Sequence, residues 1–360
     1  MAGQSYRIAA IPGDGIGEEV IAAGLDVLQA VASREGFALE VTDFDWGSER
    51  YLREGAMMPE DGLAELMPFD AIYFGSAGDP RVPDHISLWG LRLAICQPFD
   101  QYANVRPARV LPGIESPLRG IGPGDLDWVI VRENSEGEYA GAGGRAHRGH
   151  DNEVGMDVAV FTRSGVERIQ RFACALAMTR PARHLTLVTK SNAQRHGMVM
   201  WDDVFETVRP DFPELTIEKV LVDAMTTRMV LRPGDIDVVV ATNLHADVLS
   251  DLAAALTGSL GLAPTANLNP EGRFPSMFEP IHGSAFDIMG QGIANPIGAF
   301  WSAAMMLDHL GEPVAARALM TAIEQVTQAG APRPQDLGGD ATTREITDAV
   351  LAALAGRNQG

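Results

Sequence analysis

Residues 237–256 of the 360-residue chain read DVVVATNLHADVLSDLAAAL, an apolar run followed by an amphipathic helical pattern. The apolar run predicts a buried strand, and Asp247 and Asp251 then lie four residues apart, on one face of the predicted helix. Two carboxylates so placed suit a hard metal ion. The helix contains no Lys or Arg to offset them, and a solvated acidic face is the alternative interpretation. Polar residues at the carboxyl end of the predicted strand favour a ligand site, because open α/β sheets bind ligands there.

The composition is that of an ordinary globular protein: 46% of the 360 residues are hydrophobic, which allows a large core, and we expect two lobes. A net charge of −20 argues against non-specific binding to nucleic acid or to an anionic membrane, since both need a basic surface. Only two cysteines occur, Cys96 and Cys174, with no zinc or disulfide spacing. We find no signal peptide and no transmembrane run, and we expect a cytoplasmic protein.

Several predicted strands end in residues that carry chemistry. The run at 127–132 ends in Arg132, and Arg106 lies in the extended segment 102–110. Each guanidinium can bind a carboxylate through two hydrogen bonds, although a surface ion pair is the alternative. The strand at 185–189 leads to Lys190, a solvated residue or, if buried near other cations, a general base. The strand at 216–222 ends at Asp223, a third acid for the pair on the helix.

Three further segments have recognisable patterns. The opening strand at 6–11 and the glycine turn PGDGIG resemble a nucleotide-binding start, but the spacing is not GxGxxG and predicts no Rossmann domain. Residues 141–162 begin glycine-rich and then place apolar residues at every second position, from Val154 to Val160. This pattern predicts a strand pair with little core of its own, typical of an arm that pairs with a second subunit. Residues 275–296 form a long irregular run typical of a functional loop, and three helices close the chain.

Seven motifs spread along the chain resemble the β-decarboxylating dehydrogenase family, which includes isopropylmalate, isocitrate, homoisocitrate and tartrate/D-malate dehydrogenases. The motifs are IPGDGIG from residue 11, YANVRP from 102, VIVRENSEGEY from 129, TKSNAQ from 189, VDAM from 222, NLHADVLSD from 243 and EPIHGSAFDIMGQGIANP from 279. The resemblance implies an α/β fold of two lobes that share a long twisted mixed sheet. Residues 1–103 plus 258–360 would form the large, cofactor-side lobe, and residues 104–257 the small lobe with the dimer interface and the clasp arm.

The resemblance also implies cofactors, partners and site residues. NAD and Mg²⁺ or Mn²⁺ are expected, with K⁺ as a further candidate, and the protein is expected to be a homodimer whose active sites are shared. Lys190 and Asp223 would enter the site from the partner chain, with Lys190 as base and Tyr139 as acid. The implied metal ligands are Asp223, Asp247 and Asp251, the substrate ligands Arg92, Arg106, Arg132 and Asn192, and the cofactor ligands Glu279, His282, Gly283, Ser284, Ala285, Asp287 and Asn295.

The resemblance is greatest to family members that act on small hydroxy diacids. A tartrate- or D-malate-oxidising enzyme is therefore expected, and Asp287 favours NAD over NADP because it would repel a 2′-phosphate. One departure concerns a carboxylate-binding arginine of the family, at whose place this chain has Cys96, and Arg92 would substitute for it one helical turn earlier. A 3-isopropylmalate dehydrogenase and a non-catalytic regulatory subunit of the same fold are the alternatives.

Overall fold

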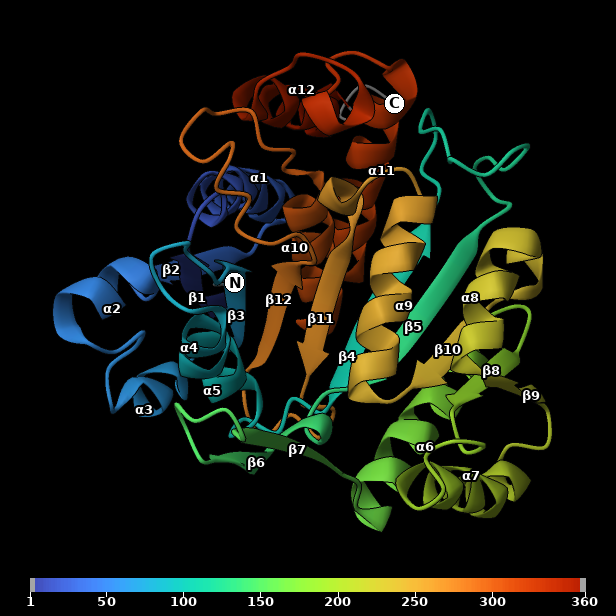
Figure 1. The fold of residues 1–360 in the computed structure, drawn as a ribbon. Coiled ribbons are helices and arrows are strands. Elements are labelled where there is room, and N and C mark those ends of the chain that lie inside the picture. Colours follow the sequence, from blue (N-terminus) through green and yellow to red (C-terminus); the bar gives the residue numbers. More distant parts are fainter. Residues whose placement is uncertain (1–3, 357–360) are drawn as a thin grey trace. The chain divides into compact units, whose positions relative to one another are not determined.

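The computed structural model describes residues 4–356. These divide into two compact units, each of which is described by itself. Unit 1 contains residues 4–101, 109–125 and 254–356, and unit 2 contains residues 102–108 and 126–253. Both units combine a sheet with packed helices, so the chain is of the α/β class (Figure 1).

Unit 1 is built on five strands in the order β2-β1-β3-β12-β11. The neighbours β2, β1, β3 and β12 pair in parallel, whereas β11 runs antiparallel to β12. All six residues of β3 are buried, as expected of a central strand covered on both faces. The strands are β1 (Ser5–Gly13), β2 (Ala38–Asp43), β3 (Ala71–Ser76), β11 (Pro264–Leu268) and β12 (Ser276–Pro280).

The helices of unit 1 cover this sheet with their apolar faces. In α1 (Gly17–Glu35) the buried Val20, Val27 and Val31 follow the helical period, and the helix ends at Gly36 in the left-handed conformation. The other helices are α2 (Ser48–Glu54), α3 (Gly62–Leu66), α4 (Asp84–Ser87), the π-helical turn η1 (Leu88–Arg92), α5 (Leu93–Cys96), η4 (Leu260–Leu262), α10 (Ile297–His309), α11 (Pro313–Ala329), η5 (Gln335–Leu337) and α12 (Thr343–Gly356).

Unit 2 has five strands in the order β4-β5-β10-β8-β9, and β5, β10, β8 and β9 are parallel. Its strands are β4 (Ala103–Arg109), β5 (Asp127–Glu133), β8 (His184–Thr189), β9 (Thr216–Leu221) and β10 (Val238–Ala241). All four residues of β10 are buried, which confirms the strand predicted from the apolar run. Its helices are α6 (Arg163–Thr179), α7 (Gly197–Val208), η2 (Arg209–Asp211), α8 (Val222–Leu231), η3 (Pro233–Asp235) and most of α9 (Asn243–Leu256).

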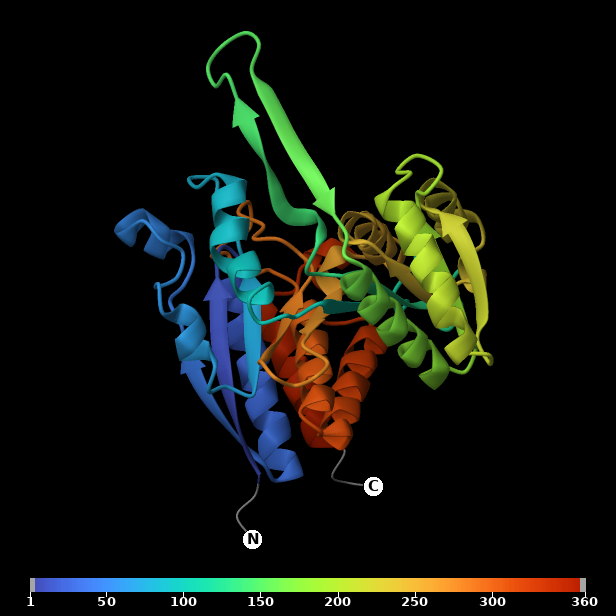
Figure 2. The ribbon, with the colours of Figure 1, turned by 90° about the horizontal axis from the view of Figure 1, so that it is seen from below.

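The predicted arm is a separate antiparallel pair, β6 (Gly137–Ala146) and β7 (Val154–Val160). Figure 2 shows this pair as a long two-stranded hairpin. Every residue of β7 is exposed, including Val154, Met156 and Val158. Both faces of this strand therefore lack a core in the single chain, as the sequence pattern predicted.

Three local features complete the description of the elements. A capping box opens α12: the Thr342 amide donates to Glu345 Oε2 at 2.8 Å, and the Glu345 amide donates to Thr342 Oγ1 at 3.2 Å. Asp223 does not end a strand but lies in the first turn of α8. The run at 275–296 is not irregular throughout, because it begins with the buried strand β12.

Candidate functional site

The two acids of α9 follow the carboxyl end of β10, where the sequence placed them. The Thr242 carbonyl accepts the Ala246 amide at 2.9 Å, which starts the helix directly after the strand. Desolvation raises the pKa of Asp251, and the charge of the neighbouring Asp247 carboxylate raises it further. The two carboxylates of this acidic pair repel each other, and a bound cation would relieve that repulsion.

Two arginines from neighbouring strands offset the negative charge of Asp247. The helix α9 itself contains no Lys or Arg that could do so. Arg132 Nη1, from β5, contacts Asp247 Oδ1, and Arg106 Nη1, from β4, lies 3.4 Å from the same oxygen. Both arginine residues are buried, with exposed fractions of 2% and 6%. Their Coulomb interaction with a carboxylate is therefore less screened than at the surface.

Polar neighbours hold each guanidinium in place. Arg106 Nε donates to Asn104 Oδ1 at 2.8 Å, and its Nη1 donates to Ser250 Oγ at 2.6 Å. Arg132 Nε donates to Asn243 Oδ1 at 2.9 Å. Because a planar guanidinium fixed in this way needs little reordering to receive a ligand, the two arginines are suited to carboxylate binding.

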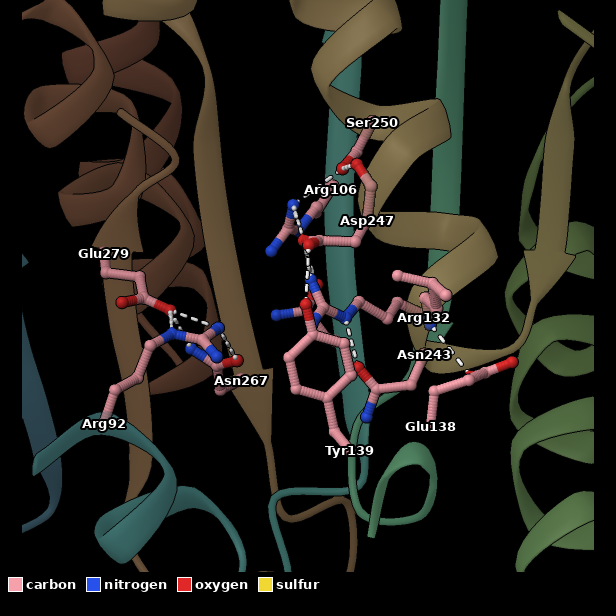
Figure 3. A network of polar contacts seen from close by, with 12 residues as sticks. Arg92, Arg106, Arg132, Glu138, Tyr139, Asn243, Asp247, Ser250, Asn267 and Glu279 are labelled. Carbon is pink, nitrogen blue, oxygen red and sulfur yellow. Dashed lines mark hydrogen bonds and ion pairs between the residues drawn. The ribbon is translucent and has the colours of Figure 1, made fainter. Parts of the chain in front are cut away.

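Tyr139 joins this group from the start of the hairpin arm. Its hydroxyl donates to Asp247 Oδ2 at 3.1 Å, and the Arg132 guanidinium carbon lies 5.2 Å from the centre of its ring. Figure 3 shows Arg106, Arg132, Tyr139 and Asp247 converging, with Asn243 and Ser250 beside them. An acid, two fixed cations and a phenol thus meet within unit 2.

Lys190 and Asp223 form a second polar pair in unit 2. Lys190, just after β8, places Nζ 2.5 Å from Asp223 Oδ1 in α8, and this contact lowers the pKa of the Asp223 carboxyl group. Asn192 is exposed in the following turn. Within residues 4–356 no group of three His, Cys, Asp or Glu side chains is placed to hold a metal ion. The single chain therefore brings Asp247 and Asp251 together but does not add Asp223 to them.

In unit 1, Arg92 and Glu279 form one buried ion pair. Arg92 Nε donates to Glu279 Oε1 at 2.8 Å, and Arg92 Nη2 lies 2.7 Å from the same oxygen. Asn267 Nδ2 also donates to Oε1, at 2.8 Å (Figure 3). Cys96 is fully buried in an apolar cluster with Phe74, so its side chain packs in the core of unit 1.

A cavity of about 410 Å³ in unit 1 is lined in part by three of the residues predicted to bind a cofactor. Its lining residues include Ile16, Leu260, His282, Ala285, Asn295 and Asp336. Gly15, next to this lining, has a φ of +60°, and a Cβ there would lie 2.0 Å from the Ser284 carbonyl oxygen, so only glycine fits. The Ile16 amide donates to that carbonyl at 2.9 Å, which ties the glycine turn to the segment that contains Ser284.

His282 and Ser284 present buried polar atoms that lack a partner among the described residues. His282 Nδ1 lies 3.1 Å from the Gly283 carbonyl and must donate to it, so Nε2 is an acceptor, and Nε2 has no partner within residues 4–356. Burial lowers the pKa of His282, which keeps the ring neutral. Ser284 Oγ is likewise without a partner in that range. Buried orphan atoms of this kind fit a ligand that supplies the missing hydrogen bonds.

The remaining predicted cofactor residues lie in the same segment. Gly283 and Asp287 are exposed, and the Asp287 carbonyl accepts Gln291 Nε2 at 2.8 Å. Sequence reasoning missed Asp336, which accepts from Asn295 Nδ2 at 3.0 Å at the cavity wall, and Asn267, which holds Glu279. No motif marked either residue, because each acts through partners distant in the chain.

Comparisons with known proteins agree with one another. Residues 7–350 match the family model described as isocitrate/isopropylmalate dehydrogenase. The chain is 66% identical over 356 residues to a protein of Agrobacterium vitis named "Probable tartrate dehydrogenase/decarboxylase", covering 99% of each chain. It is 51% identical to the D-malate dehydrogenase [decarboxylating] of Escherichia coli, covering 98% of this chain and 99% of that one. The solved isocitrate dehydrogenase of Methylococcus capsulatus superposes with a TM-score of 0.88 at 32% identity, covering 97% and 99%.

Proposed function

Because the chain belongs to the isocitrate/isopropylmalate dehydrogenase family and is an enzyme of that family, we propose that it oxidises a small 2-hydroxy diacid with NAD⁺ and a divalent metal ion. The proposed substrates are tartrate, oxidised to oxaloglycolate, meso-tartrate, converted to D-glycerate and CO₂, and D-malate, converted to pyruvate and CO₂. The names of relatives at 66% and 51% identity support this choice. We also propose a cytoplasmic location. None of the helices within residues 4–356 is long and apolar enough to cross a membrane.

One observation carries the proposal: Arg106 and Arg132 are buried and converge with Tyr139 on Asp247. A chain with a net charge of −20 binds a dianion only if local cations overcome the overall field. Two fixed guanidinium groups provide such cations and also match the planar geometry of carboxylates. In this proposal they bind the substrate carboxylates, and Asn192 and Arg92 complete the substrate contacts.

The acidic pair of α9 fits a divalent metal ion. Asp247 and Asp251 offer hard oxygen ligands on one helix face, and their repulsion favours a cation between them. Asp223 of a second copy is the proposed third ligand. A Mg²⁺ or Mn²⁺ ion held there would supply Lewis-acid polarisation of the substrate hydroxyl and carboxylate oxygens.

The cavity of unit 1 is the proposed site of the dinucleotide. His282 Nε2 and Ser284 Oγ are available to hydroxyl or amino groups, and the exposed Asp287 carboxylate suits ribose hydroxyls and disfavours a 2′-phosphate. Backbone groups of Gly283, Ala285 and Asn295 complete the proposed pocket. NAD⁺ would supply the hydride acceptor.

The proton transfers fall to Lys190 and Tyr139. Lys190 takes the proton of the substrate 2-hydroxyl group as the hydride leaves, which gives a 2-keto acid. Where a carboxylate lies β to the new ketone, its C–C bond breaks to release CO₂, and Tyr139 donates a proton to the carbon left behind. We propose that Lys190 and Asp223 act on the site of a second subunit in a homodimer, with the β6/β7 hairpin as the clasp between subunits.

The test is NADH formation from NAD⁺ with Mn²⁺, offering D-malate, the tartrate isomers and 3-isopropylmalate in parallel, with K⁺ present or replaced by Na⁺. We expect turnover of D-malate or tartrate and little with 3-isopropylmalate. Preference for 3-isopropylmalate would replace the substrate assignment with the isopropylmalate alternative. Binding of metal and NADH without turnover of any substrate would instead support a regulatory subunit.

A further inference from the structure

The contact between Arg92 and Glu279 joins a proposed substrate residue to a proposed cofactor residue. Their side chains are 12% and 7% exposed, so the pair is largely removed from water. Asn267, fully buried on β11, contacts both partners: its Nδ2 donates to Glu279 Oε1, and its Oδ1 accepts from Arg92 Nη2 at 3.2 Å. A pair held from a third side in this way has one defined geometry, unlike most surface ion pairs.

The local helix geometry explains why Arg92 points to Glu279. Arg92 ends the π-helical turn η1, and α5 follows immediately. Its sequence neighbours Leu91 and Leu93 are buried in the core, whereas Arg92 faces Glu279. A π turn inserts one residue into a helix and re-aims the side chains around it, and such turns occur frequently at functional sites.

The contacts of Glu279 with Arg92 and Asn267 use only one of its two carboxylate oxygens. All three contacts from Arg92 and Asn267 end on Oε1. Within residues 4–356 no hydrogen bond or ion pair to Oε2 is found, which leaves this oxygen for a ligand. Glu279 lies in β12, three residues before His282 and the segment that contributes to the cavity wall.

We propose that the Arg92–Glu279 pair couples substrate binding to dinucleotide binding. This inference rests on the proposed function. Arg92 contacts a substrate carboxylate, and Glu279 Oε2 accepts a hydroxyl or amide hydrogen of the dinucleotide, while Oε1 holds Arg92. Either ligand fixes the pair in the geometry that the other ligand requires, so each raises the affinity for the other, as linkage demands. Arg92 is then a positioning residue toward the dinucleotide, acting through Glu279.

The experiment measures the affinity for NADH, by its fluorescence, in the full-length protein and in Arg92→Gln, Glu279→Gln and the double variant. We expect Arg92→Gln to weaken NADH binding by about threefold or more, although Arg92 does not contact the dinucleotide in this proposal. In the Glu279→Gln background the same change should have little further effect. A dianion such as oxalate should strengthen NADH binding in the wild-type protein and not in either single variant.

Arg109→Gln is the matched control, because Arg109 pairs with Glu324 at 2.6 Å in the same unit, away from the proposed ligands. That change should leave NADH affinity unaltered. Arg92→Lys keeps the charge but not the two-point contact, and it should give an intermediate loss if Arg92→Gln does not fold. NADH affinity unchanged in the folded Arg92 variants would overturn the coupling. Failure of the wild-type protein to bind NADH would instead refute the proposed function on which it rests.

Discussion

The Tyr139 hydroxyl donates to Oδ2 of Asp247, while the other carboxylate oxygen of Asp247 receives Arg132 and Arg106. One carboxylate thus fixes the proposed proton donor and both proposed substrate-binding cations. Because the metal ion would bind the same aspartate, the position of the acid and the position of the substrate would be set together.

Tyr139→Phe should lower kcat for D-malate by about 100-fold or more, because it removes the proposed acid and keeps the ring that faces Arg132. The KM should change little, and the melting temperature should remain close to that of the wild-type protein. Tyr6→Phe removes a hydroxyl whose partner is Glu312, outside this group, and serves as the control. A kcat equal to that of the wild-type enzyme would remove Tyr139 from the mechanism.

Arg132→Lys should raise the KM for the diacid about tenfold or more, since lysine keeps the charge but cannot form the paired contacts of a guanidinium. The same change removes the bond to Asn243 and the contact with the Tyr139 ring, so kcat should also fall. Steady-state kinetics with varied D-malate at saturating NAD⁺ measure both constants. Arg180→Lys, which alters the structural ion pair with Asp237, is the control and should leave the KM unchanged.

Asp251→Asn tests the metal site without an activity assay. In the wild-type protein Mn²⁺ should raise the melting temperature, because it binds the folded state and relieves the repulsion between Asp247 and Asp251. The variant should lose this response, and without metal it should be at least as stable as the wild-type protein, since one like charge is gone. Glu206→Gln, at an exposed position of α7, should keep the response. A full Mn²⁺ response in Asp251→Asn would exclude Asp251 as a ligand.

Much of this arrangement could be predicted from the sequence, and residues 237–256 show why. The apolar run became β10, and the i,i+4 acids face one side of α9, because both depend on local periodicity alone. The resemblance to isopropylmalate and isocitrate dehydrogenases likewise predicted the fold, which the family match and the solved isocitrate dehydrogenase confirm.

Contacts between distant segments could not be predicted in the same way. No pattern within α9 indicated that Arg106 and Arg132 would balance Asp247, because they come from β4 and β5. No pattern in the sequence around Cys96 indicated the π turn that ends at Arg92, between the buried Leu91 and Leu93. The roles assigned to the site residues, and the sharing of the site between subunits, remain predictions.

Glu133 should make stability depend on pH. Its carboxyl group is buried, and burial raises its pKa to about 7, against the opposing hydrogen bonds from Ser135 and the Glu136 amide. A folded pKa above the ordinary value of 4.5 means that the stabilisation is complete below pH 4.5 and is lost as the pH rises through 7. Across that window Glu133 should cost the wild-type protein about 3 kcal/mol in the free energy of unfolding.

Urea unfolding of the wild-type protein and Glu133→Gln at pH 5 to 8 measures this effect. As the pH rises, the free energy of unfolding of Glu133→Gln should increase relative to that of the wild-type protein. Glu345→Gln is the control, because hydrogen bonds from Thr342 lower the pKa of that exposed carboxyl group below its ordinary value of 4.5, so the effect of this change should not vary between pH 5 and 8. A pH-independent difference between the wild-type protein and Glu133→Gln would contradict the assignment.

Mixing two inactive variants tests whether the site is shared between subunits. Lys190→Ala removes the proposed base, and Asp251→Asn removes a proposed metal ligand, so each variant alone should be inactive. In the proposed homodimer Lys190 of one chain serves the acids of the other, so a mixed dimer has one site with both lesions and one intact site. Co-expression with two different tags should therefore restore about a quarter of the wild-type activity for random pairing. Lys190→Ala mixed with Asp223→Asn is the control and should show no restoration, because both residues are contributed by the same chain to the site of its partner. A mixture of Lys190→Ala and Asp251→Asn as inactive as its components would place Lys190 and Asp251 in the site of one chain.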